Sequence, residues 1–308
     1  MSYYPSTSAG DVPARNTPLS WSRTVAREMV HRTSAAEVLL TDVRSLGGGG
    51  FEAAACWPRS HPTFPCDGGS RHNPLVLVET LRQLGIYLPL RYFRVPRSAH
   101  LILTDLFFEI SPDHEPEAGY GATDITCRID VPGVRSGADG AATGLRLNVV
   151  FLTGGTVFAQ GGGGVRFLSE QRYAALRGPG HARRPPAPVP GLARPAASAL
   201  AVAGARDVLI GRQGGATVVG PADPRHPFFF DHVTDHVPGM VLLEAVRQAA
   251  VVASRGALLR PRAARLIATH FTEFAPPARL VCVPHHRTCV FGVLQGGTRT
   301  TFGVLKYR

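Results

Sequence analysis

Hydrophobic and polar positions divide the chain into two similar series of elements. Each series contains one apolar helical stretch, "PLVLVETLRQ" from Pro74 and "MVLLEAVRQAAVVA" from Met240, and the second is apolar nearly all round, as in a buried helix. A strand-like run follows each helix, "HLILTDLFFEI" from His100 and "RLIATHFTEFA" from Arg265. Each series ends with a Gly-Gly-Thr turn between β-rich runs, which is typical of a hairpin. The pattern predicts a strand, a long loop, one helix and several strands, twice.

The two series align without a gap over each helix and the loop before it. Such units are longer than solenoid repeats of about 20–50 residues, so the alignment indicates a duplicated domain. The matched pairs are His61 with His226, Pro62 with Pro227, Phe64 with Phe229, Leu77 with Leu242, Glu79 with Glu244, Arg82 with Arg247 and Gln83 with Gln248.

The order of elements predicts an α+β fold. One apolar helix beside a run of antiparallel strands is typical of a sheet wrapped around that helix. The density of proline in "RGPGHARRPPAPVPGLARPAAS" indicates a semi-rigid linker. We therefore predict an irregular N-terminal tail over 1–25, an N-terminal repeat over 26–176, a linker over 177–198 and a C-terminal repeat over 199–308.

The charge balance favours anionic partners. The chain carries 33 Lys and Arg against 22 Asp and Glu, a formal net charge of +11, and Lys306 is its only lysine. This excess predicts attraction to phosphate groups or to an acidic carrier protein. Nucleic acid is not favoured, because no compact run of basic residues is interleaved with aromatics.

Other features of the composition exclude several classes of protein. The polar N-terminus lacks a secretory signal, and no stretch of about 18 apolar residues is present, so we expect a soluble cytoplasmic protein without a membrane span. The five cysteines are scattered and form no C-x-x-C motif. We therefore expect reduced thiols, no metal site and no redox cofactor.

The candidate chemistry lies on the helices. Glu244, Arg247 and Gln248 follow each other at i, i+3 and i+4 and therefore share one helical face, and the first helix repeats this set. One interpretation is an internal ion pair in which the glutamine satisfies a backbone group. The other is a functional site, because a loop rich in His and Asp precedes the helix and Gly239 leaves N–H groups free at its start.

These motifs resemble those of a known family. "PGMVLLEAVRQ" resembles the central-helix signature of hot-dog-fold enzymes that act on acyl thioesters. The longer string "RHPFFFDHVTDHVPGMVLLEAVRQAA" is similar to the most specific motif of the A-factor (γ-butyrolactone) biosynthesis proteins of actinomycetes, which are tandem double hot-dog proteins. The first-half pattern H-P-x-F … R-H-x-P-L-x-L-x-E-x-x-R-Q fits their N-terminal repeat.

The resemblance implies an acyltransferase without a cofactor. Such proteins condense a 3-oxoacyl group, delivered on acyl carrier protein, with the hydroxyl of dihydroxyacetone phosphate, and the ester cyclises to a butenolide phosphate. The resemblance points to Glu79, Glu244 and Arg247 as catalytic residues. A duplicated hot-dog is expected as a monomer or a homodimer.

The residue types suggest a role for each candidate. We expect Glu244 to act as general base, because burial raises the pKa of a carboxylate. Arg247 would pair with Glu244 or bind the phosphate group. The N–H of Gly239 would polarise the thioester oxygen. Further candidates for binding substrate or moving a proton are His232, His236 and Arg82.

Two pairings of helix and loop are open. Glu79 would face His232 across the pseudo-dyad, or Glu244 would face the first loop, which carries Asp67, Gly68 and Arg71. We expect one productive site that draws on both repeats. Residues expected to set the acyl pocket are Leu242, Val246 and Phe271, and residues expected in flexible turns are the glycine runs 47–50 and 161–164.

The sequence is also compatible with two alternative functions. The chain could be a hot-dog dehydratase or thioesterase, or a non-catalytic binder of acyl chains or butyrolactones that regulates transcription.

Overall fold

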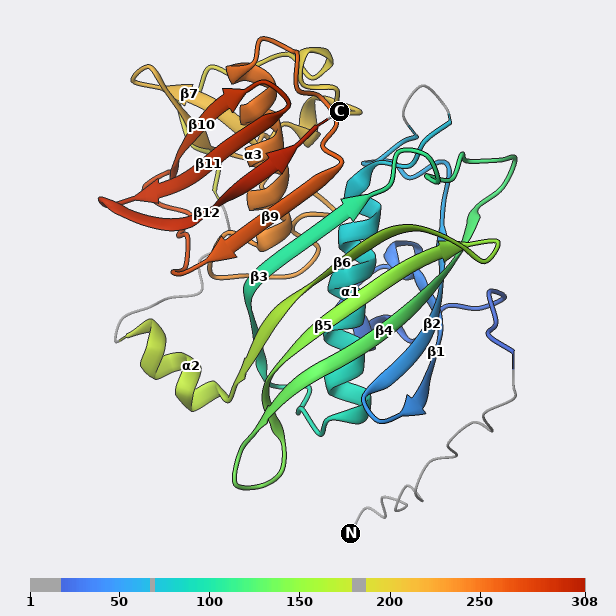
Figure 1. Cartoon of the computed structure of the whole chain (residues 1–308). Coiled ribbons are helices and arrows are strands. Elements are labelled where there is room, and N and C mark those ends of the chain that lie inside the picture. Colours follow the sequence, from blue (N-terminus) through green and yellow to red (C-terminus); the bar gives the residue numbers. More distant parts are fainter. Residues whose placement is uncertain (1–17, 67–69, 179–186, 308) are drawn as a thin grey trace.

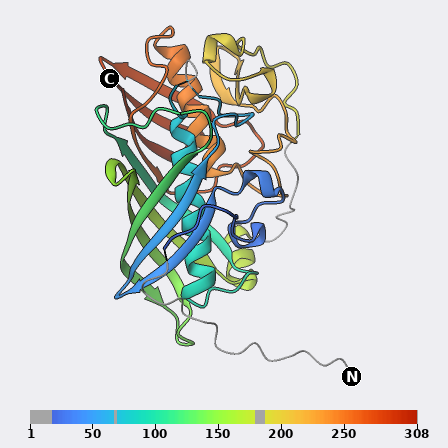
Figure 2. The same cartoon turned by 90° about the vertical axis from the view of Figure 1, so that its right-hand side faces the viewer.

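A computed structural model describes residues 18–66, 70–178 and 187–307. The described chain forms one antiparallel sheet of twelve strands, in the order β1-β2-β4-β5-β6-β3-β9-β12-β11-β10-β8-β7. Two long helices, α1 and α3, lie on the same side of this sheet (Figures 1 and 2). None of the helices in the described part of the chain has the length and apolar character needed to cross a membrane.

Each half contributes six strands and one long helix. The first half consists of β1 (Leu40–Gly47), β2 (Gly50–Trp57), α1 (Pro74–Tyr92), β3 (His100–Ile110), β4 (Thr123–Ser136), β5 (Ala142–Thr153) and β6 (Thr156–Leu168). The second half consists of β7 (Ile210–Gln213), β8 (Ala216–Val219), α3 (Gly239–Ala253), β9 (Ala263–Ala268), β10 (Arg279–His285), β11 (Thr288–Gln295) and β12 (Thr298–Lys306).

The two halves have the same strand order and meet at β3 and β9. From each outer edge the sheet runs first, second, fourth, fifth, sixth and third strand of its repeat. At the seam Asp105 lies opposite Ile267 and Glu109 opposite Ala263 in an antiparallel ladder. The predicted α+β fold, a double hot-dog with a sheet wrapped around one helix per half, is confirmed.

Burial explains why the two helices are so apolar. Every residue of α3 from Met240 to Val251 is buried between the sheet and the loops. Helix α1 begins at Asn73, whose side chain accepts a hydrogen bond from the Leu75 N–H. The N-cap position of α3 is Pro238, which provides no side-chain hydrogen bond to the start of the helix.

The two glycine runs have different secondary structures. Gly47–Gly49 have positive φ and form the β1–β2 hairpin, and the Gly-Gly pairs of the two predicted hairpins also have positive φ. The run 161–164, expected to be a turn, lies inside β6 and pairs with β3 and β5. A Cβ on Gly162 would collide with the backbone oxygen of Leu147, so the small side chains permit close packing of strands.

The predicted linker lies partly outside the described residues, which exclude 179–186. Before this gap, helix α2 (Glu170–Arg177) follows β6. After it, Leu192 packs against Gly211 and Gly220, and Ala193 forms a β-bridge with Arg212. The described end of the linker therefore packs on the second half.

Candidate active site

The same Glu-Arg-Gln triad forms on both helices. On α3, Glu244 accepts hydrogen bonds from Arg247 Nε at 2.8 Å, from Arg247 Nη2 at 2.6 Å and from Gln248 Nε2 at 2.8 Å. Gln248 also donates to the backbone oxygen of Asp207 and accepts from the N–H of Leu209. The glutamine therefore ties the helix to the segment that leads into β7, while its amide also holds the carboxylate.

The triad on α1 carries one extra cation. Arg32, which precedes β1, donates to Glu79 from Nε at 3.0 Å and pairs with it through Nη2 at 2.8 Å. Glu79 also accepts from Arg82 and Gln83. Burial alone would raise the pKa of Glu79, but the charges and hydrogen bonds of Arg32 and Arg82 outweigh it and lower the pKa to about 2. The expected effect of burial on a carboxylate therefore does not hold for Glu79.

The residue that matches Arg32 in the second half is Val202. Both follow a residue with left-handed backbone, His31 at φ 49° and Ala201 at φ 50°. Both donate their N–H to the carbonyl five residues earlier. The replacement of an arginine by a valine removes a cation and several side-chain atoms from beside Glu244.

A cavity of about 320 Å³ lies beside Val202 and Glu244. Glu244 and Arg247 form one side of it. The Arg247 guanidinium is held in place, because it also donates to the backbone oxygens of Leu200 and Leu259. The lining residues are Thr63, Phe64, Pro65, Cys66, Asn73, Pro74, Ala201, Val202, Ala203, Asp207, Phe229, Glu244, Arg247, Leu259, Arg260 and Pro261.

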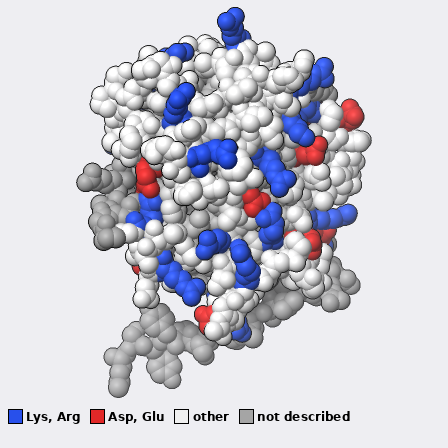
Figure 3. All heavy atoms as spheres, turned by 60° about the vertical axis from the view of Figure 1, so that its left-hand side comes forward, with Lys and Arg blue, Asp and Glu red and all other residues white. Residues whose placement is uncertain are grey.

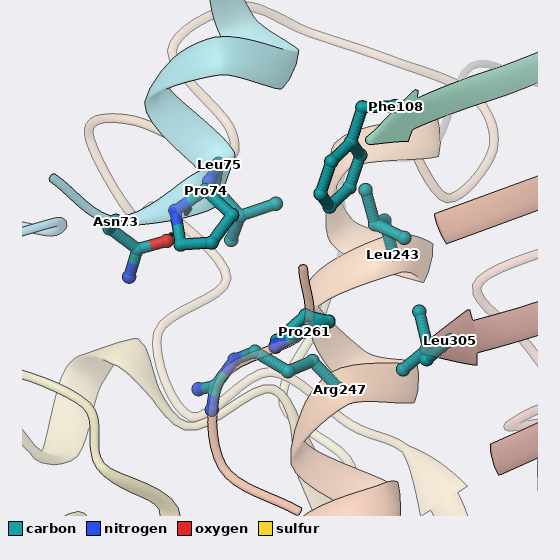
Figure 4. Close-up of a pocket in the computed structure, with 8 residues that line it drawn as sticks. All are labelled: Asn73, Pro74, Leu75, Phe108, Leu243, Arg247, Pro261 and Leu305. Atoms are coloured by element: carbon teal, nitrogen blue, oxygen red, sulfur yellow. Dashed lines mark hydrogen bonds between the residues drawn. The ribbon is translucent and has the colours of Figure 1, made fainter. Parts of the chain in front are cut away.

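A small apolar pocket adjoins this cavity (Figure 4). Its volume of about 10 Å³ has room for about one water-sized group. The two spaces share Asn73, Pro74, Arg247 and Pro261. The residues found only in the apolar pocket are Leu75, Phe108, Leu243 and Leu305. A polar cavity and an apolar pocket therefore meet where the start of α1 approaches Arg247.

The structure brings only part of the predicted site together. Glu244 and Arg247 line the cavity, whereas Glu79 and Arg82 lie in the matching cluster that Arg32 fills. His232 is about half exposed and pairs with Asp231 at 2.6 Å, and Asp231 lies 3.4 Å from Arg32. Arg32 thus stands between Glu79 and the loop of His232.

His236 and Gly239 belong to a third cluster at the start of α3. His236 contacts Asp235 at 2.7 Å, and the hydroxyl of Tyr173 on α2 donates to the same carboxylate. A Cβ on Gly239 would lie 2.9 Å from Leu103 Cδ2, so a larger residue here would require the Leu103 side chain to shift. Neither His236 nor Gly239 is among the residues that line the cavity or the pocket.

The first loop supplies residues that the sequence did not single out. Asp67 and Gly68 lie outside the described residues, and Arg71 forms a β-bridge with Glu117. Instead, the cavity wall includes Thr63 and Asn73 from the first half and Arg260 from the second. Comparing "HRTSAAEVLL" with "AVAGARDVLI" would have revealed the replacement of Arg32 by Val202.

The residues that line the apolar pocket are not those expected from the sequence. Leu242, Val246 and Phe271 line neither space, whereas Leu243, Phe108 and Leu305 do. Phe271 lies instead against His236 and Tyr173. The facing of single residues on a helix that is apolar all round cannot be deduced from its pattern.

Comparison with known proteins gives three findings. The family model described as the A-factor biosynthesis hotdog domain matches residues 14–169 and 208–272. A protein of Streptomyces virginiae named 2-oxo-3-(phosphooxy)propyl 3-oxoalkanoate synthase is 32% identical over 85% of this chain and 87% of its own, and one of the same name from Streptomyces coelicolor is 31% identical over 82% and 80%. A crystal structure of an acyl-ACP thioesterase from Bacteroides thetaiotaomicron is similar in fold, with a TM-score of 0.51 at 12% identity, and the match covers 86% of this chain and all of that one.

Proposed function

The chain belongs to the A-factor biosynthesis hotdog family, and we propose that it is an acyltransferase that esterifies dihydroxyacetone phosphate with a 3-oxoacyl group. The name shared by its relatives describes this ester: 2-oxo-3-(phosphooxy)propyl is the dihydroxyacetone phosphate part, and 3-oxoalkanoate is the acyl part. Intramolecular condensation of the ester then gives a butenolide phosphate. The enzyme acts in the cytoplasm, as a monomer or a homodimer.

The reaction exchanges a thioester for an oxygen ester. The carbonyl carbon of the 3-oxoacyl group loses its bond to the sulfur of acyl carrier protein and gains one to the hydroxyl oxygen of the C3 phosphate. The hydroxyl proton leaves on the carrier thiol. Such a reaction needs a base for the hydroxyl and a donor for the carbonyl oxygen.

Glu244 is the base in this proposal. Its two oxygens accept three hydrogen bonds, and Oε2 accepts only one of them, from Arg247 Nε. A carboxylate oxygen can accept two, so Oε2 can still take a proton from a hydroxyl in the cavity. Arg247 holds the carboxylate in place through two hydrogen bonds, and its guanidinium stabilises the negative charge that develops on the substrate oxygen as the hydroxyl loses its proton.

Asn73 polarises the carbonyl. It lines both the cavity and the apolar pocket, and its side-chain oxygen already accepts from the Leu75 N–H. Its amide N–H groups are therefore the part that donates to a substrate oxygen. The acyl chain extends from this point toward Leu243 and Phe108, where apolar side chains line the pocket.

Acyl carrier protein is the proposed donor. The face shown in Figure 3 carries more Lys and Arg than Asp and Glu. The net charge of +11 has the sign that attracts an acidic carrier.

The observation that carries the proposal is the cavity in which Glu244 and Arg247 meet residues of the other repeat. The test is incubation with 3-oxoacyl carrier protein and dihydroxyacetone phosphate, followed by mass spectrometry. We expect a phosphate-bearing ester or butenolide. Free 3-oxo acid alone would indicate a thioesterase, and ligand binding without turnover would indicate a regulatory binder.

A variant tests the role of Glu244. Glu244→Gln keeps the size of the side chain and removes the base, so we expect kcat to fall by about 10²–10⁴-fold. Glu28→Gln, on the exposed surface, is the matched control and should leave kcat unchanged. Full turnover by folded Glu244→Gln would make Glu244 a structural residue.

A further inference from the structure

We propose that Arg260 and Thr63 form the subsite for the phosphate group of the C3 substrate. This inference rests on the proposed function and names residues of the same cavity. Arg260 follows α3 in the second half, and Thr63 lies in the loop before α1 in the first half. Both line the cavity of about 320 Å³, and neither lines the apolar pocket.

Arg260 is held in place with donor capacity left over. Its Nη2 donates to the backbone oxygen of His72 at 2.8 Å and to Glu115, and its Nη1 donates to Glu115 at 3.3 Å. Within the described residues, its buried Nε has no hydrogen-bond partner. A buried guanidinium N–H without a partner costs free energy, and a phosphate oxygen would satisfy it.

Thr63, which lines the same cavity, carries a second unsatisfied group. The residue is 5% exposed, and its Oγ1 has no hydrogen-bond partner among the residues that the structure describes. Its backbone N–H donates to His61 Nδ1, which helps to fix the loop. A hydroxyl can also donate to a phosphate oxygen, so one anion would satisfy both groups.

The local charge favours an anion at Arg260 rather than at Arg247. Glu115 is shared by Arg260 and by Arg262, which lies 3.5 Å from it, so Glu115 is not reserved for Arg260. Arg247 is neutralised by Glu244 and donates to two backbone oxygens. The one other carboxylate among the described lining residues, Asp207, contacts His226 at 2.8 Å.

This placement fixes which way the bound substrates point. The phosphate lies at Arg260 and Thr63, and the acyl chain points away from them, toward the apolar side chains of Leu243 and Phe108. The hydroxyl and the thioester then meet where the two spaces join, beside Asn73 and Arg247. Glu244 lines the same cavity, which is where a base for that hydroxyl is required.

The experiment measures the KM for dihydroxyacetone phosphate in Arg260→Gln and Thr63→Val. A charge-assisted hydrogen bond contributes about 1.5–3 kcal/mol, so Arg260→Gln should raise this KM by about 10–100-fold. The KM for the acyl carrier substrate should not change. The preference for dihydroxyacetone phosphate over dihydroxyacetone should fall by the same factor. Thr63→Val, which keeps the shape, should raise the KM by a few-fold.

A second readout separates this inference from the proposed function. Binding of dihydroxyacetone phosphate without acyl donor, measured by calorimetry, should weaken in Arg260→Gln. Arg128→Gln, whose side chain is 65% exposed, serves as control for loss of positive charge. Binding that depends on Arg260 without ester formation would support the subsite and reject the acyltransferase. Ester formation and binding that are unchanged in both cavity variants would reject the subsite.

Discussion

At the scale of residues, the two Glu-Arg-Gln triads are identical but have different surroundings. Their glutamates therefore differ in their ability to accept a proton. Glu79 accepts hydrogen bonds from two guanidinium groups and one amide. Glu244 accepts hydrogen bonds from one guanidinium group and one amide. A carboxylate held by two arginines keeps its charge and is a poor base. Glu244 retains acceptor capacity and faces a cavity. The difference between the two glutamates is decided by Arg32, which lies outside both helices.

The lowered pKa of Glu79 predicts a contribution to stability that depends on pH. The folded pKa of about 2 is below the ordinary glutamate pKa of 4.5, so folding favours the charged form. This stabilisation is fully present above pH 4.5 and is lost as the pH falls toward 2. The pKa difference corresponds to roughly 3 kcal/mol of unfolding free energy.

Urea unfolding at several pH values between 2.5 and 6 would measure this contribution. The unmodified chain should lose stability more steeply over this range than Glu79→Gln, in which the titrating group is absent. The variant should also be less stable near neutral pH, because Arg32 and Arg82 lose their shared partner. If the unfolding free energies of the two proteins changed in parallel with pH, Glu79 would not be the source of the pH-dependent stability.

At the scale of elements, the sequence predicted the parts that follow from periodicity. The run from His100 is β3 residue for residue, and both Gly-Gly-Thr turns join strands. The alignment of the two loops and helices places Glu244 and Arg247 on one helical face, as found. These features depend on local side-chain pattern, which is visible in a single sequence.

The remaining features depend on packing between distant segments. Gly161–Gly164 resembles a turn in the sequence, but close strand packing makes it part of β6. The sequence does not distinguish the two pairings of helix and loop, because they differ only in the contents of the space between them. Arg32 pairs with Glu79, whereas Val202 lines the cavity beside Glu244, and both residues lie in irregular segments that have no periodicity. Arg260 contacts Glu115 far away in the chain, and no local motif indicates such a pair.

Exchanging the residues at the matched positions 32 and 202 tests whether the cavity beside Glu244 is required for activity. Val202→Arg should place a guanidinium beside Glu244, as Arg32 lies beside Glu79, and so fill the cavity. We expect turnover to fall by more than about 100-fold while the protein stays folded, because the new charge has a partner. Val202→Ala keeps the cavity open and should retain activity. A folded Val202→Arg variant with full kcat would exclude this cavity as the active site.

The reciprocal change predicts an effect on stability instead. Arg32→Val removes a partner from Glu79, from Asp231 and from the backbone oxygen of Phe228. Because Arg32 is buried, its loss should destabilise the fold by about 3–5 kcal/mol. The melting temperature checks this expectation.

At the scale of the whole molecule, neither half forms the cavity alone. Thr63 and Asn73 come from the first half, and Glu244, Arg247 and Arg260 come from the second. The halves are joined by the β3–β9 ladder, and buried contacts such as Phe64 with Phe228 also cross between them. Duplication within one chain lets one composite site retain a cavity while the matching one is filled by Arg32.

Splitting the chain between the repeats therefore tests how the site is assembled. Fragments 1–178 and 187–308, produced together, should associate through the β3–β9 ladder and the buried interface. Activity should stay within about tenfold of the intact chain, because each described residue that lines the cavity is present in one of the two fragments. Either fragment alone exposes the strand edge that the other covers, which on β3 is Asp105–Glu109, and should aggregate or remain inactive. Co-purification followed by activity measurement checks both expectations. Turnover by one fragment alone would show that the reaction does not need the composite cavity, and the pairing of Glu244 with the first loop would then be wrong.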